Sequence, residues 1–267
     1  MPRPVDPARF SVRAIGEAIE LFQLAFLEVA VVRLPLADFV LKGGANMRFF
    51  FASQRRSRDI DFDYRGQRID AFADRVDDVL SSRALAELLR ERHVTLSDPR
   101  RSKQTATTRR WKVALGGEAL FDATSKVEFS ARREMSTDYE LRQIDPVLAG
   151  RLGSRPVRLN RYGPIAMVMQ KIGALRLRGE TQPRDVFDLD LLFRNHPGAL
   201  AEAAVDAAAL EVASARALAL SYEDYRSTVA DYLEEDVVDV LGTEDAWHDM
   251  VLRVTARLDA RRAELDR

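Results

Sequence analysis

The segment from Asp59 to Tyr64 constrains the fold more than any other, because acidic and apolar residues alternate along it (DIDFDY). A period of two is that of a β-strand with two different faces. Asp59 and Asp61 then share one face, while the apolar residues between and after them occupy the other. We therefore expect a sheet around this segment, with the hydrophobic core on its apolar face and the carboxylates on the opposite face.

The rest of the pattern predicts a mixed α+β portion over residues 1–160, followed by an all-helical portion over residues 161–267. Apolar residues recur at helical spacing over 12–33 and 69–92. Strands are expected at 94–96, 105–115 and 119–129, with Gly116-Gly117 as the hairpin turn between the last two. The Pro- and Gly-containing stretch 138–159 is interpreted as mainly loop. Further helices are expected at 164–178, 184–194, 198–219, 221–240 and 243–265.

The composition excludes several classes of site and of protein. The 267 residues include no Cys, which excludes disulfides, thiolate metal sites and Cys nucleophiles. The three His residues lie far apart in the sequence. The apolar runs are too short to span a membrane, and the first residues lack the apolar segment of a signal peptide. We therefore expect a soluble, cytoplasmic protein that does not contact membranes.

Charge is distributed unevenly, although the formal net charge is only −1. Residues 223–249 are strongly acidic, whereas two basic runs lie in the α+β portion. These runs consist of Arg100, Arg101, Lys103, Arg109, Arg110 and Lys112, and of Arg151, Arg155, Arg158 and Arg161. Binding of a polyanion such as RNA and an ordinary solvated surface are both open interpretations of these runs.

Lys42-Gly43-Gly44 precedes the acidic strand and gives a second part of a candidate site. Glycines let backbone N–H groups approach a phosphate closely, and paired carboxylates suit Mg²⁺. Alone, each motif is more often a turn or an exposed strand edge. Together and in this order, they look like the opening signature of the nucleotidyltransferase superfamily.

A third constellation follows in the helical portion. Lys171, Ala174 and Arg178 recur at three and four residues and so share one helix face. Asp185 and Asp188 follow on the next expected helix. A cationic face opposite a bound metal can hold a triphosphate, and an ordinary ion-paired pair of helices is the alternative.

As an ordered set, these motifs resemble the AbiEii/AbiGii-type nucleotidyltransferase toxins, the toxin halves of bacterial toxin–antitoxin systems of the type IV kind and of phage-abortive systems. The matching stretches are Lys42–Met47, Arg55–Phe62, Lys171–Arg178 and Arg184–Leu189. The family's Thr-Ala-Leu after the glycines is Ala45-Asn46-Met47 in this chain.

The resemblance implies a polymerase-β-like nucleotidyltransferase core with a mixed sheet, followed by a helical C-terminal domain. It implies transfer of a nucleotide from a nucleoside triphosphate to an acceptor hydroxyl, with release of pyrophosphate and with Mg²⁺ or Mn²⁺ as cofactor. The expected acceptor is an RNA 3′ end, with tRNA as the first candidate, and the expected protein partner is a cognate antitoxin.

The resemblance also assigns roles to individual residues. Asp59 and Asp61 are expected to bind the metal and to be catalytic, together with Lys171 at the triphosphate and Asp185. The expected nucleotide-binding residues are Lys42, Gly43, Gly44, Ser57 and Lys171. Glu128 is a third metal-ligand candidate on a later strand, and an exposed ion pair is its alternative interpretation.

Ser57 is also a regulatory candidate. Arginines surround it in the sequence, and a phosphoryl group there adds about −1.5 to −2 of charge near the acids. Two other functions stay open at this stage. One is nucleotide transfer to a small molecule or to a protein, and the other is a non-catalytic nucleotide-binding interaction module.

Overall fold

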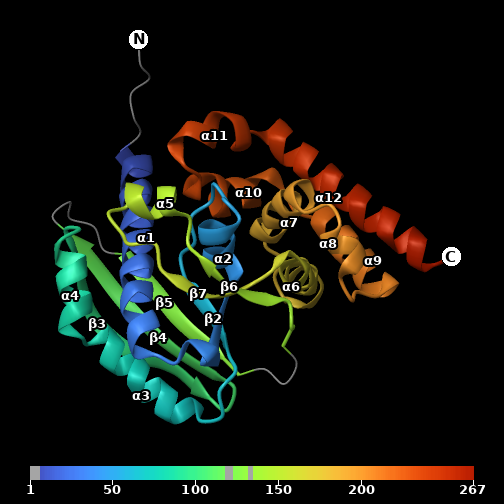
Figure 1. Cartoon of the computed structure of the whole chain (residues 1–267). Helices are drawn as coiled ribbons and strands as arrows, with labels where there is room; N and C mark the ends of the chain where they lie inside the picture. The colour runs from blue at the N-terminus through green and yellow to red at the C-terminus, as the bar shows by residue number, and fades with distance from the viewer. Residues whose placement is uncertain (1–6, 118–122, 132–134) are drawn as a thin grey trace. The chain divides into compact units, whose positions relative to one another are not determined.

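A computed structural model of the chain describes residues 7–117, 123–131 and 135–267 (Figure 1). It forms two compact units. Unit 1 comprises residues 1–52 and 56–162, and unit 2 comprises residues 53–55 and 163–267. The sequence suggested a single division after residue 160. In the structure the helical unit begins at Gly163 and also includes the short segment Ser53–Arg55.

Unit 1 is built on one seven-stranded mixed sheet with the order β3-β4-β5-β2-β1-β7-β6. The pairs β2–β5 and β1–β7 are parallel, and the other neighbours are antiparallel. The predicted α+β class is confirmed. The strands are β1 (Phe39–Lys42), β2 (Ile60–Tyr64), β3 (Val94–Thr105), β4 (Thr108–Gly117), β5 (Ala123–Ser130), β6 (Tyr139–Gln143) and β7 (Arg158–Tyr162).

The helices of unit 1 follow the apolar periodicity, except that one expected helix is divided in two. The expected helix over 69–92 is two helices, because the Ser82 hydroxyl accepts a hydrogen bond from the Leu85 N–H and so caps a new helix. The elements are α1 (Pro7–Arg33), the 3-10 turn η1 (Leu36–Asp38), α2 (Gly43–Phe50), α3 (Ile69–Leu80), α4 (Arg83–Arg90) and α5 (Pro146–Arg151).

The strands at the two edges of the sheet differ most from the expectation. Strand β3 continues to Thr105, and the stretch 138–159, expected to be a loop, contains β6 and the start of β7. Both edge strands are largely exposed, so they lack the apolar alternation that identifies a half-buried strand. Gly116 and Gly117 pair with β3, and the connection to β5 falls at 118–122, outside the described residues.

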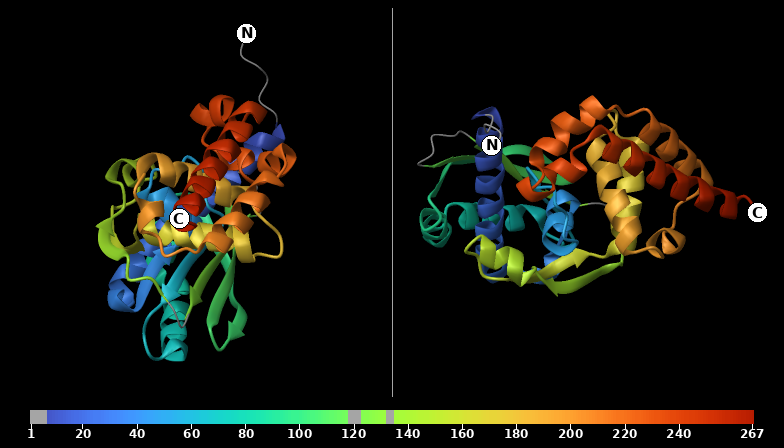
Figure 2. Two further views of the ribbon diagram at one scale, coloured as in Figure 1. Left: turned by 90° about the vertical axis from the view of Figure 1, so that its right-hand side faces the viewer. Right: turned by 90° about the horizontal axis from the view of Figure 1, so that it is seen from above.

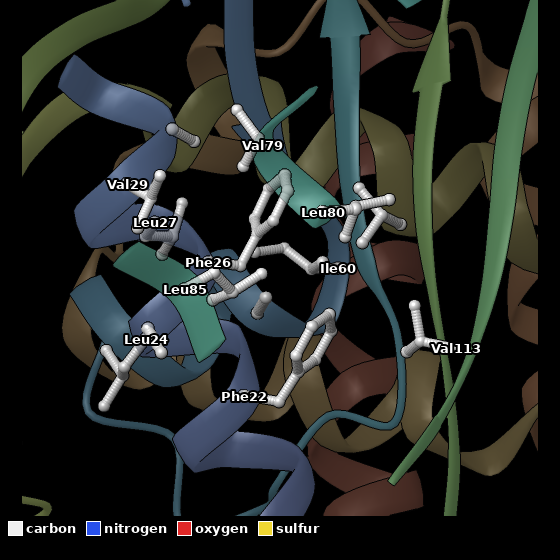
Figure 3. Close-up of a cluster of buried hydrophobic side chains, with 14 of the residues drawn as sticks. Phe22, Leu24, Phe26, Leu27, Val29, Ile60, Val79, Leu80, Leu85 and Val113 are labelled. Carbon is white, nitrogen blue, oxygen red and sulfur yellow. The ribbon is translucent and has the colours of Figure 1, made fainter. Parts of the chain in front are cut away.

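The core of unit 1 packs on the apolar face of the sheet. The rings of Phe62 and Phe129 stack with their centroids 4.7 Å apart, and Phe26 of α1 lies 6.4 Å from Phe62. Figure 3 shows a neighbouring part of this core, to which α1 contributes Phe22 and Phe26 and β2 contributes Ile60. Burying one such ring contributes about 1.5–3 kcal/mol, so β2 is firmly oriented with its acidic face away from the core.

Unit 2 is helical, and its last helix packs along α9 and α7 (Figure 2). The expected helices over 198–219 and 221–240 are interrupted. Asp206 caps α9, and Ser221 and Asp224 form a capping box at α10. The elements are α6 (Pro164–Leu177), α7 (Pro183–Asn195), α8 (Ala199–Glu202), α9 (Ala207–Leu218), α10 (Tyr222–Thr228), η2 (Ala230–Tyr232), α11 (Glu235–Leu241) and α12 (Glu244–Leu265).

Candidate active site

Three carboxylates alternate along β2 and its approach. Asp59 directly precedes the strand, Asp61 lies within it, and Asp63 follows two residues later. Asp59 and Asp61 are half-buried, whereas Asp63 is only 3% exposed. Asp63 was not among the predicted site residues, although the period of two that places Asp59 and Asp61 on one face extends to it.

Asp63 joins three strands. One of its carboxylate oxygens binds the Lys42 ammonium at the end of β1, and the other accepts a hydrogen bond from the Tyr162 hydroxyl at 2.8 Å. Lys42 is itself 7% exposed. Lys42 was predicted to bind nucleotide, and in the structure its ammonium is held by Asp63. It therefore fixes the end of β1, where the glycine turn begins, to the acidic strand.

The glycine turn lies against the second acid. Gly43 and Gly44 form the first turn of α2, and Gly43 has a left-handed φ of +69°. A Cβ atom on Gly43 would lie 3.2 Å from Asp61 Oδ2. The glycine therefore allows the backbone at the start of α2, with its unsatisfied N–H groups, to lie close to the acid.

Ser57 shapes the loop that leads into β2. Its hydroxyl donates a hydrogen bond to the main-chain carbonyl of Asp59 at 2.8 Å, and its own carbonyl accepts one from Gln23 Nε2 at 3.0 Å. Ser125 Oγ of β5 donates to the carbonyl of Arg58 at 2.8 Å. The loop that carries Asp59 is therefore fixed from both α1 and β5.

Basic side chains of the neighbouring strands contact the acids. Glu128 of β5 is in register with Asp61 on the adjacent parallel strand. Arg110 Nε donates to Glu128 Oε2 at 2.6 Å, and Ser130 Oγ donates to Glu128 Oε1 at 3.2 Å. Lys126 Nζ lies 3.3 Å from Asp59 Oδ2.

These contacts define which residues fit a metal ion. Among the described residues, no three acidic, His or Cys side chains are arranged to hold a metal. Both oxygens of Glu128, the predicted third ligand, are engaged by Arg110 and Ser130, and one oxygen of Asp59 lies 3.3 Å from the Lys126 ammonium. Asp59 and Asp61 stay the candidate set, because they were predicted together and share the face that Gly43 approaches. Mg²⁺ commonly takes one or two carboxylates and completes its shell with water and substrate phosphates, so a two-carboxylate set fits it.

Unit 2 contains the other predicted site residues as a buried ion network. Lys171 Nζ on α6 lies 3.1 Å from Asp185 Oδ1 and also contacts Asp188 Oδ2, both on α7. The side chains of both aspartates are fully buried, and that of Lys171 is 7% exposed. The Lys171 ammonium, predicted to bind triphosphate, is therefore neutralised by two carboxylates in the structure.

The short segment 53–55 belongs to the same network. Arg55 donates to both carboxylate oxygens of Asp188 at 3.3 and 3.4 Å, and the Glu234 N–H donates to the Gln54 carbonyl at 3.0 Å. Burial by itself would raise the pKa of Asp188. The charges of Lys171 and Arg55 outweigh burial and hold this pKa below the usual value.

Comparison with known families identifies the chain. The family model described as "Nucleotidyl transferase AbiEii toxin, Type IV TA system" matches residues 26–264. The chain belongs to this AbiEii toxin family. It is accordingly a nucleotidyltransferase, and the type IV toxin–antitoxin description implies an antitoxin as its partner.

Solved structures agree with the family at the level of the fold. JHP933 from Helicobacter pylori has a TM-score of 0.59 at 17% identity, over 98% of this chain and 95% of that protein. The nucleotidyltransferase toxin MenT4 from Mycobacterium tuberculosis has a TM-score of 0.50 at 18% identity, over 96% and 92% of the two chains. No curated protein sequence matches the chain. Across the described residues, none of the helices combines the length and apolarity needed to cross a membrane.

The first prediction concerns the crowding of Asp61 by a side chain at residue 43. We expect Gly43→Ala to lower nucleotide transfer, because its Cβ would push the Asp61 carboxylate away by a few tenths of an ångström, and to cost about 1–2 kcal/mol through the left-handed backbone. Gly153→Ala is the matched control, since Gly153 has a similar φ of +60° but no atom within 4 Å of its Cβ position. Equal activity of the two variants would contradict the close approach.

The second prediction concerns Asp188. Its folded-state pKa is depressed, so its ionised form stabilises the fold above the unfolded-state pKa, and this stability is lost as the pH falls through the folded-state pKa. We expect Asp188→Asn to lower the unfolding free energy by about 3–5 kcal/mol at neutral pH, because it removes the buried negative charge that contacts both Lys171 and Arg55. Thermal unfolding followed over a pH series should show this difference shrinking in acid. The exposed Asp239→Asn serves as control, and a pH-independent difference would exclude the ionised pair as the cause.

Proposed function

We propose that the chain adds nucleotides from a nucleoside triphosphate to an RNA 3′ end, with tRNA as the first candidate, in a metal-dependent reaction that its antitoxin silences. The observation that carries the proposal is Asp61 on β2 against the glycine turn that begins α2, with Asp59 two residues before it, just ahead of the strand. Carboxylate oxygens near the N–H groups at the start of a helix support binding of a metal ion and a phosphate there.

In this proposal, Asp59 and Asp61 hold the divalent ion. A divalent ion held there would supply acidification of the attacking hydroxyl and stabilisation of the leaving oxygens. The N–H groups of Gly43 and Gly44 bind the phosphates of the incoming nucleotide. Lys42 positions this turn through Asp63, and Ser57 positions the carbonyl and side chain of Asp59.

The roles of Lys171 and Asp185 stay predictions, and their contacts favour positioning over direct chemistry. They connect α6 with α7, and Asp188 of the same network holds Arg55. The chain continues from Arg55 directly into the loop that carries Ser57 and Asp59. We therefore propose that the network fixes the start of this loop.

The basic run over 100–112 gives partial support to RNA as the acceptor. Arg101 binds Asp74 and Asp77 of α3, and Arg109 binds Asp70. These two arginines therefore belong to the helix-covered side of the sheet and are not part of an RNA surface. Arg100, Lys103, Arg110 and Lys112 share a face with the acids. Arg110 is ion-paired with Glu128, so Arg100, Lys103 and Lys112 are the members of the run that support a polyanionic substrate.

The third prediction tests reaction class and acceptor together. Total RNA is incubated with Mg²⁺ and each labelled triphosphate in turn, and label is expected in a discrete RNA band. Asp59→Asn and Asp61→Asn should lower transfer by at least the order of 10²-fold while the unfolding temperature is kept, because the charge at the transferring phosphoryl group is lost. Asp78→Asn, an exposed change on α3, is the control.

Two outcomes of this assay would contradict the proposal. If a folded Asp59→Asn or Asp61→Asn variant kept wild-type transfer, the substituted aspartate would have no role in the reaction. Label in the protein or small-molecule fraction, with none in RNA, would show that RNA is not the acceptor.

The fourth prediction concerns Ser57 as a control point. We expect Ser57→Asp to be inactive, because it places negative charge beside Asp59 and removes the donor to the Asp59 carbonyl. Ser57→Ala loses only the hydrogen bond and should keep partial transfer. Ser81→Asp is the matched control, since the Ser81 hydroxyl makes the same kind of bond, to the Asp77 carbonyl, at an exposed position. Full activity of Ser57→Asp would rule out the switch.

A further inference from the structure

Three cations lie in a row across three neighbouring strands of unit 1. Arg100 of β3 is paired in register with Lys112 of β4, and Lys112 is paired with Lys126 of β5. Residues paired across antiparallel strands point to the same face of a sheet. At the next strand, Lys126 Nζ contacts Asp59 Oδ2 at 3.3 Å. The row therefore starts at the sheet edge and ends at a candidate catalytic acid.

The row has an electrostatic cost in the protein by itself. Like charges directly opposite each other on adjacent strands are destabilising. Arg100 is 65% exposed, and its pair with the equally exposed Asp98 at 3.4 Å is of the kind that contributes little to stability. An anion bound between these cations would relieve the repulsion. The arrangement is thus better suited to binding than to holding the fold together.

A small cavity lies along the row. Its volume is about 220 Å³, and its lining includes Arg100, Lys112, Lys126 and Thr124, together with one carboxylate, Asp98, so three cations face one acid. Pockets for whole drug-sized ligands are usually about 300–1,000 Å³, so this cavity suits a smaller group such as a phosphodiester. Because neighbouring β-strands lie about 4.8 Å apart, the three cations span about 10 Å. This length gives room for neighbouring phosphates of one nucleic-acid chain.

We propose that the Arg100–Lys112–Lys126 row binds the sugar-phosphate backbone of the acceptor RNA next to its 3′ end. The inference rests on the proposed function, since it supplies the path by which an RNA terminus reaches Asp59. Phosphate contacts of this kind position a strand without reading its bases. The row therefore sets where the strand ends, and it is not a source of base specificity.

The test removes Arg100 and Lys112, because Lys126 is the cation of the row that contacts the candidate catalytic residue Asp59. Arg100→Gln/Lys112→Gln is compared with the wild type for binding of a short, fluorescently labelled single-stranded RNA over a salt series, without triphosphate or divalent metal. We expect weaker binding and a log–log salt slope smaller by about 0.7 per lost contact, or about 1.4 in total. Because like charges are removed, the unfolding temperature should not fall.

A matched variant controls for the loss of net charge. Arg83→Gln/Arg90→Gln removes two exposed arginines of α4 and should leave the slope unchanged. In the transfer assay, the row variant should raise the KM for RNA, while the Kd for triphosphate is kept.

The two possible failures are distinguishable. An unchanged slope and KM in an enzyme that labels RNA would overturn the row and leave the proposed function standing. Row-dependent RNA binding in a protein that labels no RNA would support the row and overturn the proposed function.

Discussion

The buried ion pair between Lys42 and Asp63 is the contact on which the candidate active site depends. With the Tyr162 hydroxyl, it joins β1, β2 and β7 at the level where α2 begins. Removing one partner of a buried pair costs about 3–5 kcal/mol, whereas the intact pair gives little net stability. Its value is therefore positional, because it fixes the distance between the glycine turn and the strand that carries Asp61.

Strand β2 separates two environments within a few residues. Its apolar face contributes Phe62 to a stack of aromatic rings, and its polar face contributes acids that are contacted by cations of β1 and β5. A shift of the pairing register of β2 by one residue would put carboxylates into the aromatic core, so this register is strongly determined. The same alternation divides the basic run, sending Arg101 and Arg109 to α3 and leaving Arg100 and Lys112 beside the acids.

The sequence predicted the helices and strands that bury one face. It did not predict exposed strands, or side-chain contacts between residues that are distant in the sequence. The alternation over 59–64 and the helical periodicity of α1, α6 and α7 were sufficient to find those elements and two of the acids. The exposed edge strand β6 has no apolar alternation to detect. The partner of Lys42 was missed, and for Lys171 the sequence left a triphosphate ligand and an ion-paired pair of helices both open. A phosphate ligand and a buried ion pair require the same residue types, and only the fold distinguishes them.

The assignment of Ser53–Arg55 to unit 2 has a consequence for how the protein is made. Arg55 reaches Asp188 across 133 positions of sequence, so during synthesis the segment that precedes Asp59 has to wait for the helical unit. Contacts of such long range are slow to form and form late. In a toxin, this order of assembly delays the Arg55 contact until the chain has been made at least as far as Asp188 on α7, so a product truncated before Asp188 lacks that contact.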